Sequence, residues 1–280
     1  MNKIIGIIGY GNMGSAIAER LKADYEVWVF DKDKEKTKNI LDVGIAKGIL
    51  VLLDKVDTVI LAVKPKDLTR VFNTILEKRK KGLEDKLVIS IAAGIRTAFI
   101  EACLRRTRVI RAMPNLPARF GDGMICLCKG RYAKKNDLHF AKQLFKKLGK
   151  VLVLKENMMD ASTAISGSGP GYFYDWVEGE NIEEIKNTAP RFASSLTAAA
   201  QEIGFTYPIA RILAETTTKG SILYLEETKL SPAEAKKQVA SKGGTTEAGL
   251  EVLHNGGSLN EAVKAALKRA RKLVKFISVG

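Results

Sequence analysis

Three glycines near the start of the chain stand at the spacing G-x-G-x-x-G, in the sequence GYGNMG at positions 9–14. An apolar stretch, 3–8, precedes them and a helix-forming stretch follows. Gly9 permits a tight turn, Gly11 permits close approach of the backbone to a pyrophosphate, and Gly14 permits close packing of helix on strand. The helix start also offers free N–H groups to phosphate oxygens. The expected dinucleotide contacts are Gly9, Gly11, Asn12, Met13 and Gly14.

An acidic residue ends the second apolar stretch of the chain. Asp31 follows Gly9 by 22 residues, which is where a carboxylate accepts hydrogen bonds from the ribose hydroxyls of a dinucleotide. The same carboxylate repels a 2′-phosphate. Lysines follow at once and partly neutralise it: Lys32, Lys34 and Lys36. We therefore expect NADH or NADPH as cofactor, with NADH preferred by less than about a hundredfold because exposed charges are screened.

Small residues and prolines follow three further strand-like stretches. Pro65 turns the chain over the crevice where open α/β sheets bind ligands. Small residues at 90–94 leave room for a nicotinamide ring, and Asn115 stands rigidly between two prolines. The cofactor-side residues expected here are Ala62, Val63, Lys64, Pro65, Ala92 and Asn115.

A glycine pair near the C-terminal end joins two helical patterns. The sequence SKGGTT at 241–246 follows one helix, exposes two glycine N–H groups and opens the next helix with hydroxyls. Backbone N–H groups at a helix start bind anions. The pattern therefore predicts a carboxylate-binding site, and the alternative is an ordinary joint between two helices.

Strands alternate with helices through the first half of the chain. This alternation predicts a doubly wound sheet of roughly eight strands whose last part need not be parallel. The expected strands are 3–8, 26–30, 58–63, 87–91, 108–112, 123–128 and 150–154. The expected helices between them are 13–22, 33–41, 67–80, 97–105 and 134–148.

Beyond about residue 160 only helical patterns remain. We expect helices over 160–176, 191–203, 208–226, 231–240, 244–254 and 258–276. The polar stretch Glu178–Pro190 breaks the pattern and is interpreted as a loop or an inserted excursion. The predicted fold is α/β: an N-terminal Rossmann dinucleotide-binding domain, 1–158, followed by an all-α dimerisation and substrate domain, 159–280.

Composition excludes several function classes. The chain has 280 residues and a formal net charge of +15, but its lysines are scattered without interleaved aromatic residues, so we expect no nucleic-acid partner. No long apolar run predicts a membrane span and no leader is visible. Cys126 and Cys128 would share one buried strand face, and neither they nor Cys103 has metal-ligand spacing, so no metal site is expected. The expected location is cytoplasmic.

Six motifs together resemble the pyrroline-5-carboxylate reductase family. GYGNMGSAIAERL, AVKP, SIAAGI, RAMPNLP, ISGSGPGYF and SKGGTTEAGLEVL occur in the family's order over most of the chain. The resemblance implies hydride transfer from a reduced nicotinamide to the C=N carbon of 1-pyrroline-5-carboxylate, giving L-proline in the last step of proline biosynthesis. A protonated imine is already a good electrophile, so positioning is the protein's main task.

The resemblance also assigns roles at the glycine pair. Gly243 and Gly244 would hold the substrate carboxylate through their N–H groups, together with Ser241 and Thr245. Thr246 would hydrogen-bond the ring nitrogen. The helical domain would interlock with that of a second copy, giving a homodimer or a higher homo-oligomer with the site between one subunit's Rossmann domain and helices that include the partner's.

Three departures from the family pattern affect these implied roles. Gly171 replaces an alanine, Lys242 replaces a proline, and Glu178–Pro190 adds about a dozen residues to the dimer region. Two alternatives remain. One is a two-domain NAD(P)-dependent dehydrogenase of the 3-hydroxyacid type, with Lys186 or Lys219 protonating an alkoxide. The other is an inactive nicotinamide-binding protein, for which only the charge speaks.

Overall fold

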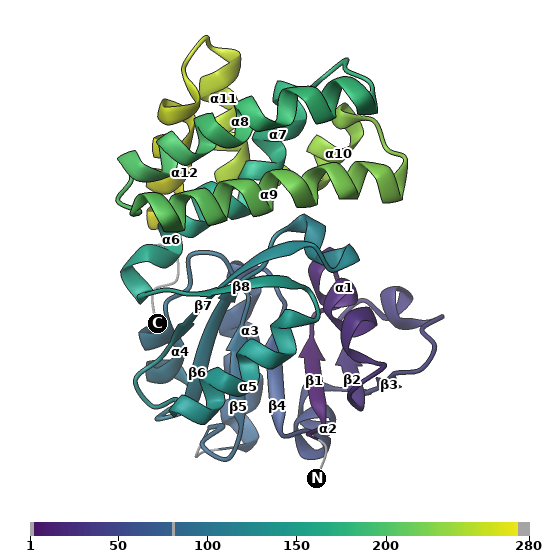
Figure 1. The fold of residues 1–280 in the computed structure, drawn as a ribbon. Coiled ribbons are helices and arrows are strands. Elements are labelled where there is room, and N and C mark those ends of the chain that lie inside the picture. The colour runs from purple at the N-terminus through teal and green to yellow at the C-terminus, as the bar shows by residue number, and fades with distance from the viewer. Residues whose placement is uncertain (1–2, 80–81, 274–280) are drawn as a thin grey trace.

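An eight-stranded sheet forms the lower half of the molecule (Figure 1). The computed structural model describes residues 3–79 and 82–273. The strands are β1 (Ile5–Ile8), β2 (Val27–Phe30), β3 (Gly44–Ile45), β4 (Thr58–Leu61), β5 (Leu87–Ser90), β6 (Arg108–Met113), β7 (Gly123–Lys129) and β8 (Gly149–Val153). Their order is β3-β2-β1-β4-β5-β6-β7-β8, and β6 and β7 are the antiparallel pair. The Rossmann-type sheet, with a last part that is not all parallel, is confirmed.

Helices cover both faces of the sheet because its central strands are apolar on both sides. β1, β4 and β5 are buried along their whole length, as parallel strands between helical layers are. The α-helices of this half are α1 (Asn12–Leu21), α2 (Ile49–Lys55), α3 (Leu68–Lys78), α4 (Thr97–Cys103) and α5 (Lys135–Lys146). The 3-10 turns are η1 (Lys34–Thr37), η2 (Pro65–Asp67), η3 (Leu116–Phe120) and η4 (Glu156–Met158).

The predicted helix 33–41 is wrong. The segment forms only the single turn η1, in which Asp33 accepts a hydrogen bond from the Glu35 N–H and Thr37 alone is buried. A segment with so little apolar surface gains too little from packing to extend a helix. The sequence analysis also missed β3 and α2, which are two and seven residues long and carry too short a pattern to identify.

Among the described residues, the upper half in Figure 1 contains helices and no strand. Its elements are α6 (Met159–Ser162), the π-helical turn η5 (Thr163–Gly167), α7 (Gly169–Trp176), α8 (Ile182–Glu202), α9 (Tyr207–Thr228), α10 (Pro232–Val239), α11 (Thr245–His254) and α12 (Leu259–Leu273). The long helices α8 and α9 lie side by side above the sheet. The all-helical second half is confirmed, and residues 274–276 of the last predicted helix lie outside the described residues.

The predicted loop Glu178–Pro190 is also wrong, because most of it is the first part of α8. Asn181 accepts hydrogen bonds from two N–H groups of the first turn, and the Glu184 carboxylate accepts from the Asn181 N–H. This reciprocal capping box fixes the helix start. Pro190 lies inside the helix although it has no N–H to donate, at a cost. Burial of neighbours such as Phe192 offsets that cost.

Side chains of β7 link the two halves. Met124, Cys126 and Cys128 are buried and belong to the same hydrophobic core as the helices of the upper half. Cys126 and Cys128 thus share one buried strand face, as expected. Among the described residues, no helix has the length and apolarity to cross a membrane.

Candidate functional site

The three glycines of the first turn occupy the conformations that their spacing predicts. Gly9 has φ +103°, and a Cβ there would lie 2.7 Å from the Ala62 carbonyl oxygen. A Cβ on Gly14 would collide with the Gly9 carbonyl oxygen, so helix α1 approaches β1 only because this position lacks a side chain. A Cβ on Gly11 would meet open space. The backbone at Gly11 is therefore open to a ligand.

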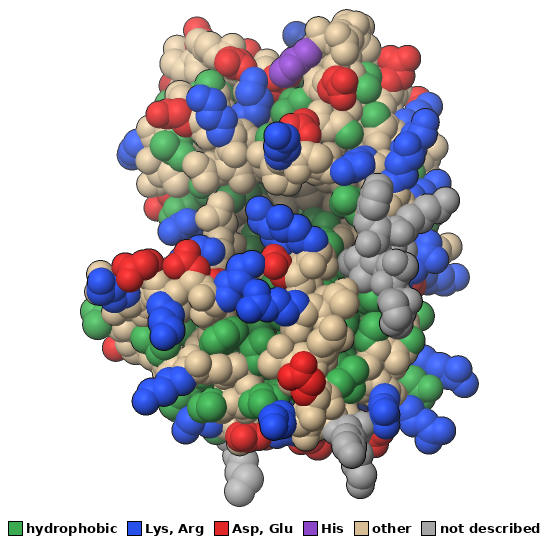
Figure 2. Space-filling view, turned by 180° about the vertical axis from the view of Figure 1, so that it is seen from behind, with side chains coloured by type: hydrophobic (Ala, Val, Ile, Leu, Met, Phe, Trp, Pro, Cys, Tyr) green, Lys and Arg blue, Asp and Glu red, His purple; other side chains and the backbone are tan. Residues whose placement is uncertain are grey.

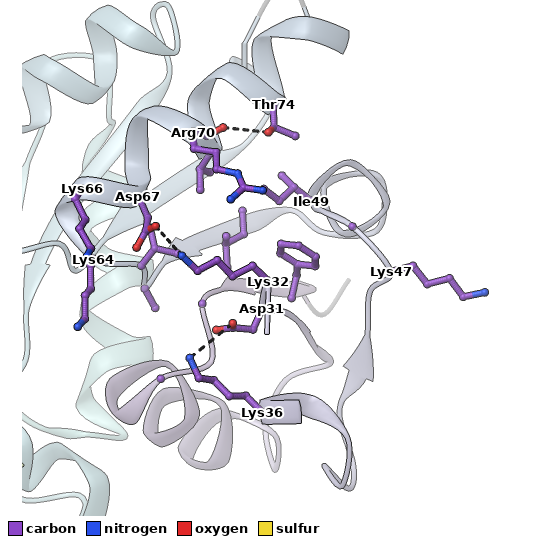
Figure 3. Close-up of a pocket in the computed structure, with 18 residues that line it drawn as sticks. Asp31, Lys32, Lys36, Lys47, Ile49, Lys64, Lys66, Asp67, Arg70 and Thr74 are labelled. Carbon is purple, nitrogen blue, oxygen red and sulfur yellow. Dashed lines mark hydrogen bonds and ion pairs between the residues drawn. The ribbon is translucent and has the colours of Figure 1, made fainter. Parts of the chain in front are cut away.

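A cavity of about 560 Å³ opens beside this turn (Figure 3). It lies at the carboxyl ends of β1, β2 and β4 and is closed by α3 and the segment before α2. Six cationic and two acidic residues line it: Lys32, Lys36, Lys47, Lys64, Lys66, Arg70, Asp31 and Asp67. The excess of positive charge suits an anionic ligand such as a dinucleotide.

Asp31 is already engaged by the backbone of the glycine turn. Its Oδ2 accepts from the Tyr10 N–H at 2.6 Å and its Oδ1 from the Asp33 N–H at 2.9 Å. Lys36 Nζ lies 3.8 Å from Oδ1, and the Asp31 side chain is only 8% exposed. A carboxylate has about four acceptor positions, so Asp31 retains capacity for a ribose hydroxyl. In Figure 3 the neighbouring Lys32 points instead to Asp67, at 2.8 Å.

The residues predicted to contact the cofactor fall in two groups. Those that line the cavity are Gly9, Gly11, Asp31, Ala62, Val63 and Lys64. Those outside its lining are Asn12 and Met13 at the start of α1, Gly14 within it, Pro65 at the start of η2, Ala92 after β5, and Asn115 after β6. The sequence analysis missed lining residues from elsewhere in the chain, among them Lys47 and Arg70. The sequence does not distinguish a lysine or arginine at this cavity from one elsewhere on the surface.

Asn115 ties the end of β6 to β7. Its side chain is 2% exposed, and its Oδ1 accepts from the Met124 N–H at 2.8 Å. Among the residues described, its Nδ2 has no hydrogen-bond partner. A buried amide N–H₂ without an acceptor is costly, and its place beyond a strand end fits a donor toward a ligand.

The glycine pair forms a tight turn between α10 and α11. The Gly244 N–H donates to the Ser241 carbonyl at 2.8 Å, and the Gly243 N–H donates to the Glu247 carboxylate at 2.5 Å. These are the two N–H groups from which the sequence analysis expected carboxylate binding, and both have internal acceptors. Within the described part of the chain, the next N–H groups, at Thr245 and Thr246, have none. They are the usual unsatisfied donors of a helix start.

Thr245 and Thr246 pack against the motif that opens α7. The hydroxyls of Ser168 and Thr245 lie 2.9 Å apart. Thr246 is 4% exposed, and its methyl group occupies the space where a Cβ on Gly171 would stand. The motif ISGSGPGYF and the glycine-pair turn are therefore one structural unit, although about 70 residues of sequence separate them.

A buried ion network lies at the boundary between the halves. Arg111 is 1% exposed and pairs with Glu156 at 2.6 Å and Asp160 at 2.8 Å. The other Glu156 oxygen accepts from the N–H and hydroxyl of Thr97, at the start of α4. Burial raises the pKa of Glu156, but the Arg111 charge and the Thr97 hydrogen bonds outweigh it and hold the pKa below its ordinary value.

Two sequence profiles match the chain. One, described as pyrroline-5-carboxylate reductase dimerisation, matches residues 188–273. The other, described as NADP oxidoreductase, coenzyme F420-dependent, matches residues 4–94. The pyrroline-5-carboxylate reductase of Synechocystis is 33% identical, with 97% of this chain and 98% of the relative covered. The chain belongs to the pyrroline-5-carboxylate reductase family. The Methanosarcina acetivorans enzyme of the same name is 32% identical over 98% of this chain and 99% of its own.

Solved structures of the pyrroline-5-carboxylate reductase family share the whole fold. The Plasmodium falciparum protein, determined with NADP bound, has a TM-score of 0.63 and 26% identity over 98% of both chains. The Coxiella burnetii protein has a TM-score of 0.63 and 29% identity, with 98% of this chain and 99% of that one covered.

Two lysines considered for the alternative dehydrogenase reaction lie away from the cofactor cavity of this family member. Lys186 pairs with Glu226 at 3.0 Å, and the Lys219 side chain is 81% exposed. Both line a groove between α8 and α9. A lysine that protonates an alkoxide must reach the substrate beside the nicotinamide, whereas Lys186 pairs with Glu226 and Lys219 with Asp122.

Proposed function

We propose that this protein reduces 1-pyrroline-5-carboxylate to L-proline by hydride transfer from NADH or NADPH. The observation that carries the proposal is the packed unit of Ser168, Gly171, Thr245 and Thr246, which joins two family motifs at a helix start. Family membership over the whole chain supports it. The inactive-protein alternative has no comparable support.

The residues around the cavity fit a dinucleotide. Gly11 leaves its backbone open, and the cations that line the cavity outnumber the acids. We assign Gly9, Gly11 and the start of α1 to the pyrophosphate and Asp31 to the adenosine ribose. Ala62–Pro65, Ala92 and Asn115 lie after β4, β5 and β6 and would bound the nicotinamide. When bound, the reduced nicotinamide supplies the hydride.

At the substrate end, we propose that the start of α11 binds the carboxylate. The unsatisfied N–H groups of Thr245 and Thr246 replace those of Gly243 and Gly244 in this role, because the glycine N–H groups are engaged. Ser241 adds a hydroxyl, and the Thr246 hydroxyl orients the ring nitrogen. Holding the two reacting carbons together in this way lowers a barrier by up to roughly 7–11 kcal/mol.

We also propose a homodimer that forms through the α8–α9 groove. The groove has a volume of about 610 Å³, and small side chains of α8 along it permit close approach of another helix. Ala193 and Ala198 are among these residues. A symmetric pair would place the same groove on both subunits.

The proposed biological role is the last step of proline biosynthesis in the cytoplasm. A reducing compartment agrees with the three free cysteines, Cys103, Cys126 and Cys128. Growth of a proline auxotroph on expression of this chain tests the role, and cell fractionation tests the location.

An NAD(P)H-oxidation assay tests the activity. We expect oxidation of NAD(P)H with 1-pyrroline-5-carboxylate and none with a panel of keto acids. In the reverse direction we expect no reduction of NAD(P)+ with a panel of 3-hydroxyacids. Thr246→Ala should lower kcat/KM by about 10–100-fold, or about 1.4–2.7 kcal/mol, with cofactor Kd unchanged. Thr216→Ala, in α9 and outside the turn, is the control. Turnover of a hydroxyacid but not of the imine would favour the dehydrogenase alternative.

A further inference from the structure

The turn before α11 needs a backbone conformation that its sequence only partly presets. The Gly244 N–H donates to the Ser241 carbonyl, which closes a four-residue turn, and Gly243 at its third position has φ +70°. Lys242, at the second position, has a negative φ. This combination defines a type II turn, in which proline at the second position presets the backbone. Lys242 is exposed and supplies no such restraint.

Side chains from two helices hold Gly243 on both sides. Its N–H donates to Glu247 Oε2 at 2.5 Å, and its carbonyl accepts from Arg269 Nε at 2.7 Å. Glu247 belongs to α11 and Arg269 to α12. A Cβ on Gly243 would lie 3.2 Å from Arg269 Nη2, so the guanidinium is packed against the turn. The two peptide groups that flank Gly243 are therefore both fixed.

Arg269 is directed at the turn rather than at an acid. Among residues 3–79 and 82–273 it forms no ion pair with a carboxylate, whereas Lys264 on the same helix pairs with Glu202. Arg269 is half-buried, and its Nε donates a charge-assisted hydrogen bond to the Gly243 carbonyl. A half-buried arginine whose identified partner is a single loop carbonyl indicates a role in loop geometry.

We propose that Arg269 is a positioning residue for substrate binding. Resting on the proposed function, the inference is that Arg269, with Glu247, keeps the Ser241–Gly244 turn in the type II form that aims the N–H groups of Thr245 and Thr246 at the substrate carboxylate. The hydrogen bonds with Glu247 and Arg269 restrain the turn, as a proline at position 242 would restrain it by fixing its backbone.

The test replaces Arg269 with Met in the full-length protein. Arg269→Met should raise KM for 1-pyrroline-5-carboxylate about tenfold, since it removes one charge-assisted hydrogen bond. KM for the cofactor and kcat should change less than about threefold, because the cofactor cavity and the reacting groups are untouched. Arg271→Met is the matched control, since Arg271 is an exposed arginine of the same helix.

A second substitution separates positioning from general destabilisation. Adding Lys242→Pro to Arg269→Met presets the turn and should return KM for the imine to within about threefold of the original value. If Arg269→Met does not fold, Arg269→Lys and Glu247→Gln, which each weaken one contact, carry the same test. Unchanged KM for the imine, or a rise that Lys242→Pro does not reverse, overturns the inference. An original protein without imine turnover overturns the proposed function instead.

Discussion

Gly171 is a second departure from the family pattern beside Lys242, and it packs against Thr246, just after the substrate turn. A Cβ there would collide with the methyl group of Thr246 and would stand 3.5 Å from Val239. The absence of a side chain at 171 therefore sets where Thr246 lies. Because Thr246 is β-branched, displacing its methyl group rotates its hydroxyl as well.

We expect Gly171→Ala to lower kcat/KM for the imine about tenfold, since it moves the Thr246 hydroxyl off its position. Thr246→Ser keeps the hydroxyl and lacks the methyl group. The double variant, Gly171→Ala with Thr246→Ser, should therefore have the same kcat/KM as Thr246→Ser alone, so that the two effects are not additive. Steady-state kinetics of the four proteins measure it, and additive losses would show that the collision is relieved elsewhere.

Cofactor choice depends on the surroundings of Asp31. A 2′-phosphate beside this carboxylate needs a compensating cation, and Lys36 Nζ lies 3.8 Å from its Oδ1. Lys36→Ala should lower kcat/KM with NADPH several-fold more than with NADH, while NADH stays modestly preferred in the original protein. Lys38→Ala is the control, because Lys38 pairs with Glu35 instead. Equal effects with both cofactors would place the 2′-phosphate away from Lys36.

Single residues were predictable where the requirement is local. Gly9 and Gly14 follow from the steric demands of one turn, which the sequence displays directly. The engagement of the Gly243 and Gly244 N–H groups does not follow in this way. It depends on the turn closing onto Ser241 and on the rotamer of Glu247, neither of which spacing specifies.

At the scale of elements, long apolar patterns predicted the strands and helices that matter most. Failures occurred where packing overrides local preference. The polar composition of 178–190 argued against a helix, yet the capped start at Asn181 and the buried face of α8 maintain one. In the opposite direction, the charged segment 33–41 lacked a face to bury and stayed a single turn. Partners distant in sequence decide such cases.

The buried ion network of Arg111, which joins β6, α4 and α6, predicts that the stability of the protein depends on pH. The Glu156 pKa is held below its ordinary value, so the ionised form stabilises the fold. This contribution is complete above the unfolded-state pKa and is lost as pH falls through the folded-state pKa. Glu156→Gln should lower stability at pH 7 by about 1–3 kcal/mol.

Thermal unfolding between pH 3 and 7 measures this difference. The fall in Tm at neutral pH should be about 2–4 °C per kcal/mol for a protein of this size, and the gap between variant and original should narrow toward pH 3. Glu227→Gln, at an exposed glutamate of α9, is the control. A gap that stays constant across the range would mean that Glu156 acts through packing rather than through its charge.

At the scale of the whole molecule, the two halves share a core through β7 and an ion network through Arg111. Figure 2, seen from behind, shows the surface hollowed between them, with Lys and Arg side chains along the hollow. Sequence patterns predicted both halves but not this joint. The apolar pattern of β6 does not indicate that Arg111 forms buried ion pairs, because its partners are more than 40 residues away in the sequence.

The α8–α9 groove leads to the last prediction, which concerns assembly. Ala198 lies in the groove and is exposed, so a large charged side chain there would keep two copies apart and leave a buried charge unpaired at the interface. Ala198→Arg should elute as a monomer at micromolar concentration, whereas the original protein and the control Asn187→Arg, exposed on the same helix outside the groove, elute as dimers or larger. Light scattering coupled to size exclusion gives the masses. If Ala198→Arg keeps the mass of the original oligomer, the interface lies on another face of the helical half; if the original protein is itself a fully active monomer, the homodimer proposal fails.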